Sequence, residues 1–160
     1  MKHLSQDEEK QAIKWMKEAA VLAASSSCKR KKCGSIIVSN DKIIGKGFNS
    51  PPGNLKSQCR CLLDKEMLNK NVTDKTCCVH AEQRAIMDAL KNNPQKIKGS
   101  TLYFTRVDSE GKIEKSGKPY CTICSKMSLD AGVGEFVLWH EEGICAYNTE
   151  EYNKLSFDFK

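Results

Sequence analysis

Aromatic side chains and long apolar runs are both scarce in this sequence of 160 residues. Phenylalanine, tryptophan and tyrosine make up 7% of the chain, and they do not interleave with the basic runs. Proteins that bind single-stranded nucleic acid usually combine a basic groove with aromatic stacking platforms, so a nucleic-acid substrate is disfavoured. No apolar run approaches the roughly 18 residues that a membrane-spanning helix needs, and we therefore expect no membrane association.

Signals for export, for repeats and for a second domain are also missing. The N-terminal stretch MKHLSQDEEKQ is polar and acidic, whereas a secretory signal has a basic segment followed by an apolar one. We therefore expect a cytoplasmic protein. Because no linker or internal repeat is visible, residues 1–160 are expected to form one domain, which is long enough to bury a core without disulfides.

Cysteine and positive charge, by contrast, are plentiful. In a reducing compartment, clustered cysteines more often bind metal or take part in chemistry than form disulfides. The net charge of +6 suits an anionic substrate such as a nucleotide, but a solvated surface explains it equally well. The basic run Lys29–Lys32 is open to the same two interpretations, a solvated loop or an attractor of phosphate. Six of the nine cysteines form close pairs: Cys59 and Cys61, Cys77 and Cys78, and Cys121 and Cys124.

Hydrophobic periodicity divides the chain into helices and strands. Helices between the later strands favour parallel strand pairing and an α/β sandwich. The predicted helices are one between a Ser5 capping box and Ser25–Ser27, then His80–Asn92, Cys121–Ala131 and a short one from Thr149. The predicted strands are Ser35–Ser39, Lys42–Phe48, Thr101–Arg106, Glu135–His140 and Ile144–Asn148.

Two short motifs carry candidate metal ligands. His80-Ala-Glu82 stands at the predicted start of one helix and Cys121-x-x-Cys124 at the start of another. Two cysteines three residues apart at a helix start lie nearly on one side, so both sulfur atoms can reach one ion. Together with His80 they offer three ligands, which leave the fourth tetrahedral position of a zinc ion for water, as in catalytic zinc sites.

Glu82 is expected to move protons rather than bind the metal. Positions two apart on a regular helix face roughly opposite ways, so His80 and Glu82 converge only over the first turn. A carboxylate there can take a proton from the attacking water and deliver it to the substrate, a role that contributes roughly 10²–10⁴ in rate. In a purely structural zinc site, Glu82 would have no function.

Taken together, the two motifs resemble the signature of the cytidine and deoxycytidylate deaminase superfamily, which is H-x-E followed by P-C-x-x-C. The resemblance runs from about Ala20 to Asn148 and looks closest to deoxycytidylate (dCMP) deaminases. It implies a three-layer α/β/α sandwich, in which a five-stranded mixed sheet has helices on both faces. The matching stretches are SSSCKRKKCGSIIVSNDKIIGKGFNSPPGN, CVHAEQRAI, GSTLYFTR and YCTICSKMSLDAGVGEFVLW.

The resemblance also implies an activity, the zinc-dependent hydrolysis of dCMP to dUMP with release of ammonia. The zinc ligands and the catalytic glutamate would be the four residues of the two motifs. Asn49 would hydrogen-bond the sugar, and Ala81 would offer its backbone to the base. Because relatives commonly assemble, a homo-oligomer is expected.

The sequence departs from the family pattern at three places. Tyr120 precedes Cys121 where the family has proline, the segment Val107–Tyr120 is inserted close to the metal, and Ser50 replaces a glycine. These departures concern the substrate more than the chemistry. The alternatives are a deaminase of another nucleoside, free base or base analogue, a deaminase of a base in nucleic acid, and a zinc-stabilised binding domain without activity.

The remaining clustered cysteines are candidates for a second, structural zinc, which some dCMP deaminases carry near the N-terminal hairpin. By resemblance, its ligands would be Cys28, Cys59 and Cys61, with Cys78 or Cys77 completing the set. A closed four-thiolate site would tie a glycine- and proline-rich loop to the helix ends. The alternative is that these cysteines are small buried apolar residues.

Overall fold

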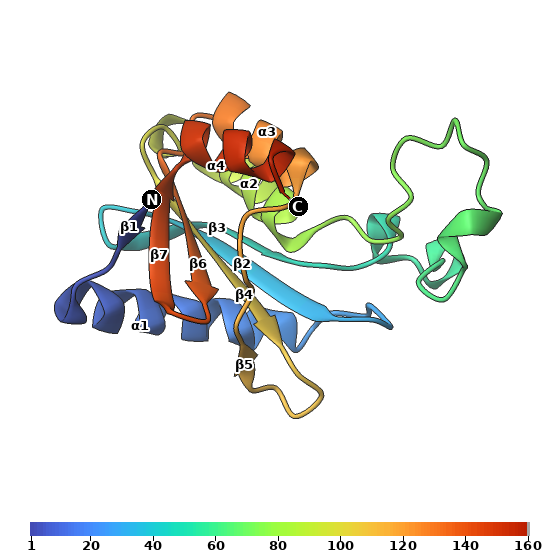
Figure 1. Ribbon diagram of the computed structural model, residues 1–160, viewed down its shortest axis with the longest axis horizontal. Coiled ribbons are helices and arrows are strands. Elements are labelled where there is room, and N and C mark those ends of the chain that lie inside the picture. The colour runs from blue at the N-terminus through green and yellow to red at the C-terminus, as the bar shows by residue number, and fades with distance from the viewer. Residues whose placement is uncertain (160) are drawn as a thin grey trace.

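A mixed seven-stranded β-sheet forms the middle layer of the protein in a computed structural model that describes residues 1–159 (Figure 1). The strands lie in the order β1-β7-β6-β4-β2-β3, and β5 pairs with β4 beside this path. Of the pairings, β4 with β6 is parallel and the others are antiparallel. The strands are β1 (Lys2–His3), β2 (Lys32–Ser39), β3 (Lys42–Phe48), β4 (Thr101–Val107), β5 (Ile113–Glu114), β6 (Glu135–His140) and β7 (Gly143–Asn148).

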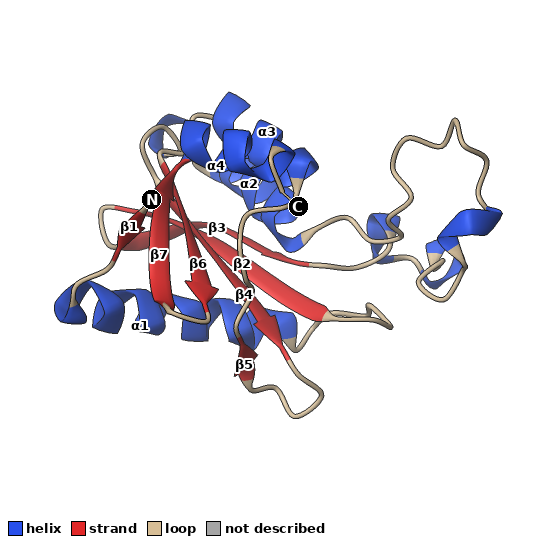
Figure 2. Cartoon of the chain, viewed as in Figure 1, coloured by secondary structure: helices blue, strands red, loops and turns tan. Residues whose placement is uncertain are grey.

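Helices cover both faces of this sheet (Figures 1 and 2). One face is covered by α1 (Gln6–Ala23), which packs on β2 and β4. The other face carries α2 (Ala81–Asn92), α3 (Thr122–Asp130) and α4 (Thr149–Phe157), of which α2 lies on β3. No helix in residues 1–159 has the length and apolar character needed to cross a membrane.

The predicted three-layer α/β/α sandwich is therefore confirmed, but the sheet has seven strands and not five. The two additional strands, β1 and β5, are two residues long each and pair with β7 and β4. So short a strand has no side-chain alternation that a sequence pattern could reveal. The parallel pairing expected from the order of elements is found between β4 and β6.

The helices lie close to the sheet because three strand residues that face them are glycines, namely Gly34, Gly45 and Gly47. A Cβ atom at Gly34 would lie 1.8 Å from the carbonyl oxygen of Ala19 in α1. At Gly47 in β3 it would lie 2.2 Å from the carbonyl oxygen of Ala81, the first residue of α2. Any side chain here would push the helix away, so glycine sets the distance between helix and sheet.

A long segment between β3 and α2, residues 51–78, projects from the sandwich, and we call it the arm (Figure 1). Its base is closed by a backbone pair, in which Val79 N donates to Ser50 O at 2.9 Å and Ser50 N to Val79 O at 3.3 Å. Most arm residues are exposed, with Leu62 retaining 79% of its surface. Its regular structure consists of short 3₁₀ turns, including Lys65–Met67.

We expect Gly47→Ala to destabilise the protein strongly, because its Cβ would overlap the backbone of α2. Overpacking of this kind costs about 3 kcal/mol, which corresponds to a fall in melting temperature of roughly 10 °C for a chain of this size. Gly134→Ala is the control, since its Cβ would meet backbone at 3.1 Å and not at 2.2 Å. Thermal unfolding followed by circular dichroism measures both; equal melting temperatures would contradict the expectation.

Candidate active site

His80, Cys121 and Cys124 converge at the N-terminal ends of two helices. His80 is the N-cap of α2 and Cys121 is the N-cap of α3, where its sulfur accepts a hydrogen bond from the backbone N–H of Cys124. The Nδ1 atom of His80 lies 3.2 Å from Sγ of Cys124 and 3.3 Å from Sγ of Cys121. The two motifs, 41 residues apart in the chain, thus bring three potential metal ligands to one point.

These three donor atoms fit a zinc ion. Zinc bonds of about 2.0 Å to nitrogen and 2.3 Å to sulfur at tetrahedral angles would separate the donors by roughly 3.6 Å. The observed separations from the imidazole nitrogen are 3.2 and 3.3 Å, so small side-chain adjustments suffice. A set of one histidine and two cysteines leaves one tetrahedral position open, which is the pattern of catalytic zinc and not of closed structural sites.

The protonation states of the three potential ligands depend on one another. Hydrogen bonds from Cys124 and from His80 lower the pKa of the Cys121 thiol to about 4. The hydrogen bond with Cys121 raises the pKa of His80 to about 9, while the pKa of Cys124 is raised by the same neighbour and by burial. Binding of a metal cation would release the protons held by these groups, because thiols that coordinate a metal are deprotonated and a coordinating histidine is neutral. Metal affinity at this point therefore decreases as the pH falls.

Glu82 lies beside these potential ligands in the first turn of α2 and is almost fully buried, with 6% of its surface exposed. Burial raises the pKa of its carboxyl group, and the nearby His80 opposes this effect. A carboxyl group with a raised pKa can accept and release a proton closer to neutral pH than an ordinary one. The site therefore contains a proton carrier next to the potential metal ligands.

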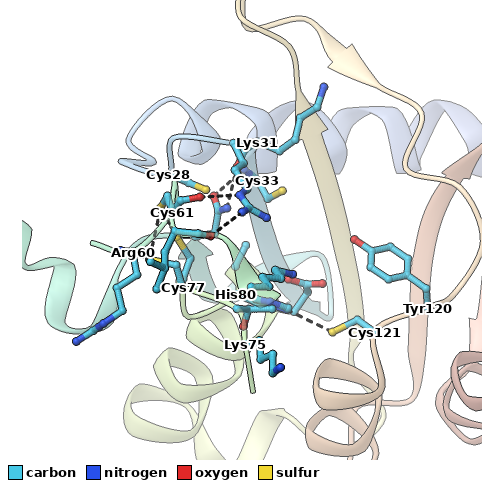
Figure 3. Close-up of a pocket in the computed structure, with 18 of the residues that line it drawn as sticks. Cys28, Lys31, Cys33, Arg60, Cys61, Lys75, Cys77, His80, Tyr120 and Cys121 are labelled. Atoms are coloured by element: carbon cyan, nitrogen blue, oxygen red, sulfur yellow. Dashed lines mark hydrogen bonds between the residues drawn. The ribbon is translucent and has the colours of Figure 1, made fainter. Parts of the chain in front are cut away.

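A cavity of about 240 Å³ opens over this group and is shared with the arm (Figure 3). Figure 3 shows Cys61 and Arg60 of the arm on one side, Tyr120 on the other, and His80 between them. The size lies near the lower limit of small-molecule pockets, roughly 300 Å³. Tyr120 belongs to the inserted segment Val107–Tyr120, so this insertion forms one wall of the pocket.

The two predicted substrate contacts also line this cavity. The side chain of Asn49 already binds the protein: Oδ1 accepts from Cys33 N at 2.8 Å and from Ser26 Oγ at 2.7 Å, and Nδ2 donates to Lys31 O at 2.9 Å. Asn49 therefore anchors the loop before β2 and keeps one amide hydrogen for a ligand. Ala81 is the first residue of α2, where a backbone N–H has no intrahelical acceptor.

Five further cysteines gather at the base of the arm in two overlapping groups. One group is Cys28, Cys61 and Cys78, and the donor atoms within it lie within 4.8 Å of one another. The sulfur atoms of the other group, Cys59, Cys61 and Cys77, also lie within 4.8 Å of one another. The predicted set thus lies in one region, but Cys59 shares a group with Cys77 and not with Cys28 or Cys78. Spacing in the sequence could not show that Cys61 belongs to both groups.

The family of the chain is indicated by comparisons with known proteins. The family model for the cytidine and deoxycytidylate deaminase zinc-binding region matches residues 9–140. A deoxycytidylate deaminase of Saccharomyces cerevisiae is 27% identical over 128 residues, which are 77% of this chain and 35% of that protein. The chain thus spans about a third of the yeast protein. A deoxycytidylate deaminase of Mycobacterium phage D29 is 26% identical over 74% of this chain and 86% of its own length.

Solved structures show the same similarity. The dCMP deaminase of cyanophage S-TIM5, crystallised in complex with dCMP and dUMP, is 30% identical, with a TM-score of 0.57 and coverage of 84% of this chain and 82% of that chain. A cytidine deaminase of Burkholderia pseudomallei covers 88% of this chain and 94% of its own, with a TM-score of 0.56. Because it is only 16% identical, this second likeness concerns the fold alone.

We expect Cys121→Ser to remove one zinc ion per chain, because it leaves only His80 and Cys124 as ligands. Elemental analysis of the purified protein measures the zinc content. Cys145→Ser is the control, since this buried cysteine lies outside the three groups of potential metal ligands. A zinc content that is the same in both variants would contradict the assignment of Cys121 as a ligand.

Proposed function

The chain belongs to the cytidine and deoxycytidylate deaminase zinc-binding family, and on this basis we propose that it hydrolyses dCMP to dUMP and ammonia. The observation that carries the proposal is the convergence of His80, Cys121 and Cys124 at a cavity whose lining includes the buried Glu82. The choice of dCMP is supported by the two curated relatives, both named deoxycytidylate deaminases, and by the cyanophage enzyme crystallised with dCMP and dUMP.

In this proposal His80, Cys121 and Cys124 hold zinc, and Glu82 carries protons. Zinc, when bound, supplies the Lewis acidity that makes water nucleophilic near neutral pH. The carboxylate of Glu82 accepts a proton from the attacking water and donates it to N3 of the cytosine ring. It then transfers the second proton to the departing amino group. Water is consumed and ammonia is released, so the carboxylate ends in its starting state.

The substrate is oriented by groups at the floor of the pocket. The N–H of Ala81 at the start of α2 is directed to a polar group of the base, where the positive end of the helix favours an acceptor. The remaining amide hydrogen of Asn49 donates to the sugar. Tyr120, whose hydroxyl group points toward the pocket in Figure 3, closes the side opposite the arm.

The proposal extends to domain organisation, assembly and location. Residues 1–160 act as a single domain, and an oligomer is supported by apolar side chains on the outer face of α2, where Met87 and Leu90 are 47% and 43% exposed. A reducing cytoplasmic location is supported by the nine cysteines, all of which are free in the described structure.

The arm cysteines are proposed to hold a second, structural zinc. Cys61 is buried and lies 3.5 Å from Sγ of Cys77 and 3.6 Å from Sγ of Cys78. Four thiolates are enough for a closed tetrahedral site, and Cys28 would connect it to the loop before β2. Because the arm is largely exposed, a metal site would supply the stability that an apolar core provides elsewhere.

The activity is tested with purified protein and dCMP, by following dUMP and ammonia formation. The parallel substrates are deoxycytidine, cytidine, cytosine and a set of aminopurines. We expect turnover of dCMP with the highest kcat/KM. Turnover of another amine without any of dCMP would reject dCMP as the substrate. No reaction with the whole panel would favour a binding domain.

In the same assay, Glu82→Gln is expected to lower kcat by roughly 10²–10⁴ because the proton carrier is lost. Its zinc content should stay at the wild-type level, since Glu82 is not a ligand. Glu150→Gln is the matched control, because it makes the same change in the first turn of α4. A Glu82→Gln variant with wild-type kcat would contradict its catalytic role.

For the second metal, we expect Cys61→Ser to lower the zinc content from about two ions to about one per chain, because Cys61 belongs to both thiol groups. Dialysed protein is measured by elemental analysis, with Cys145→Ser again as the control. Limited proteolysis should then cut within the arm more readily. A zinc content of one ion in the wild-type protein, unchanged by Cys61→Ser, would exclude this site.

A further inference from the structure

The two cysteine groups at the base of the arm share one member. Cys61 belongs to both, and its sulfur lies 3.5 Å from that of Cys77 and 3.6 Å from that of Cys78. We call Cys28, Cys61 and Cys78 the first thiol group. The second thiol group is Cys59, Cys61 and Cys77. Within residues 1–159, these sulfur atoms thus form two groups of three that meet at Cys61, and not one group of four or five.

A single zinc ion cannot use all of these sulfur atoms. A closed tetrahedral site takes four thiolates, so one cysteine is left over whichever four are chosen. Zinc–sulfur bonds of about 2.3 Å at tetrahedral angles hold sulfur atoms roughly 3.8 Å apart. The two separations measured from Cys61, 3.5 and 3.6 Å, are close to this value. One ion would require the two groups to move together around one point, whereas two ions would not.

Hydrogen bonds from the surrounding chain hold the thiol groups in place. The sulfur of Cys77 accepts a hydrogen bond from the backbone N–H of Arg60 at 2.9 Å, and such bonds orient the ligands of metal sites. The guanidinium of Arg30 donates to two backbone carbonyl oxygens of the arm, that of Cys61 among them, at 2.6 and 3.3 Å. The loop that carries Cys28 is therefore tied to the arm without any metal, so both groups are preformed.

We propose that the arm binds two divalent metal ions in one cluster, in which the thiolate of Cys61 bridges the ions. The first thiol group holds one ion and the second thiol group holds the other. The inference adds a further ion to the structural zinc proposed above and does not depend on the deaminase activity. Thiolates select zinc and similar soft cations. Five thiolates and two divalent cations leave one net negative charge, and the guanidinium of Arg30 lies beside it.

The two ions would connect different parts of the chain. The ion of the first group would link Cys28, in the loop before β2, to Cys78 at the end of the arm. The ion of the second group would link Cys59 to Cys77, which closes the arm on itself. Four of the five cysteines line the pocket, so the cluster would form the wall opposite Tyr120 (Figure 3). Because most arm residues are exposed, metal ions would supply the cross-links that an apolar core provides elsewhere.

The test counts the bound ions and detects the bridge directly. Two cations that share a thiolate repel each other, so dialysed protein is expected to keep one arm ion and to bind the second only at saturating metal. The full chain is therefore exchanged into excess Cd²⁺, a thiolate-binding substitute for zinc, and native mass spectrometry counts the ions. We expect about three ions per chain, one at the His80 group and two in the arm. With an NMR-active cadmium isotope, the two arm signals should be split by coupling through the sulfur of Cys61.

Single substitutions distinguish the bridge from the other ligands. Cys28→Ser and Cys59→Ser each remove one ligand from one group, so each should lower the count by one ion and abolish the splitting. Cys61→Ser should lose both arm ions, because Cys61 belongs to both groups. Cys145→Ser is the control, since this cysteine belongs to neither group, and it should keep the full count. Circular dichroism verifies that each variant is folded.

Three results would overturn the inference. A wild-type count of about two ions at saturating Cd²⁺ would mean that the arm holds a single ion. Two arm signals without splitting would mean that Cys61 does not bridge the ions, and this result needs no variant. An unchanged count in Cys59→Ser would mean that the second thiol group binds no metal. A protein that binds about three ions but deaminates no substrate would reject the proposed function and keep this inference.

Discussion

The close approach of α2 to β3 is the constraint on which the site depends. Gly45 and Gly47 leave room for the helix backbone, whose carbonyl oxygens would lie 2.3 and 2.2 Å from Cβ atoms at these positions. Because α2 begins at this contact, its N-cap His80 and first-turn Glu82 are fixed against the sheet. The candidate ligands Cys121 and Cys124, at the start of α3, complete the group.

The parts of the protein that have a regular side-chain period were predicted well from the sequence. The limits of Lys42–Phe48 and Glu135–His140 agree with the structure, since both strands alternate or run apolar between clear turn residues. The convergence of His80 with Cys121 and Cys124 was also anticipated, because helix starts constrain short motifs. The role of these residues in catalysis stays a prediction until the variants are assayed.

The arm could not be predicted in the same way. It has no apolar period, and its contacts are made by thiols and backbone carbonyls whose partners lie far away in the chain. The grouping of Cys59 with Cys77, and the two carbonyl bonds of Arg30, depend on how the arm folds back onto the loop before β2. The sequence indicated the basic run Lys29–Lys32 but not which cation would face the pocket.

The closed base of the arm has a consequence for how this fold diversifies. Ser50 and Val79 hold the two ends of the arm together by a pair of backbone bonds, so its length and sequence are nearly independent of the sheet. Loop length adds little to the entropy of closure once the ends are joined. The arm can therefore change in length and sequence, and with it one wall of the pocket, while the sheet and the starts of α2 and α3 keep their positions.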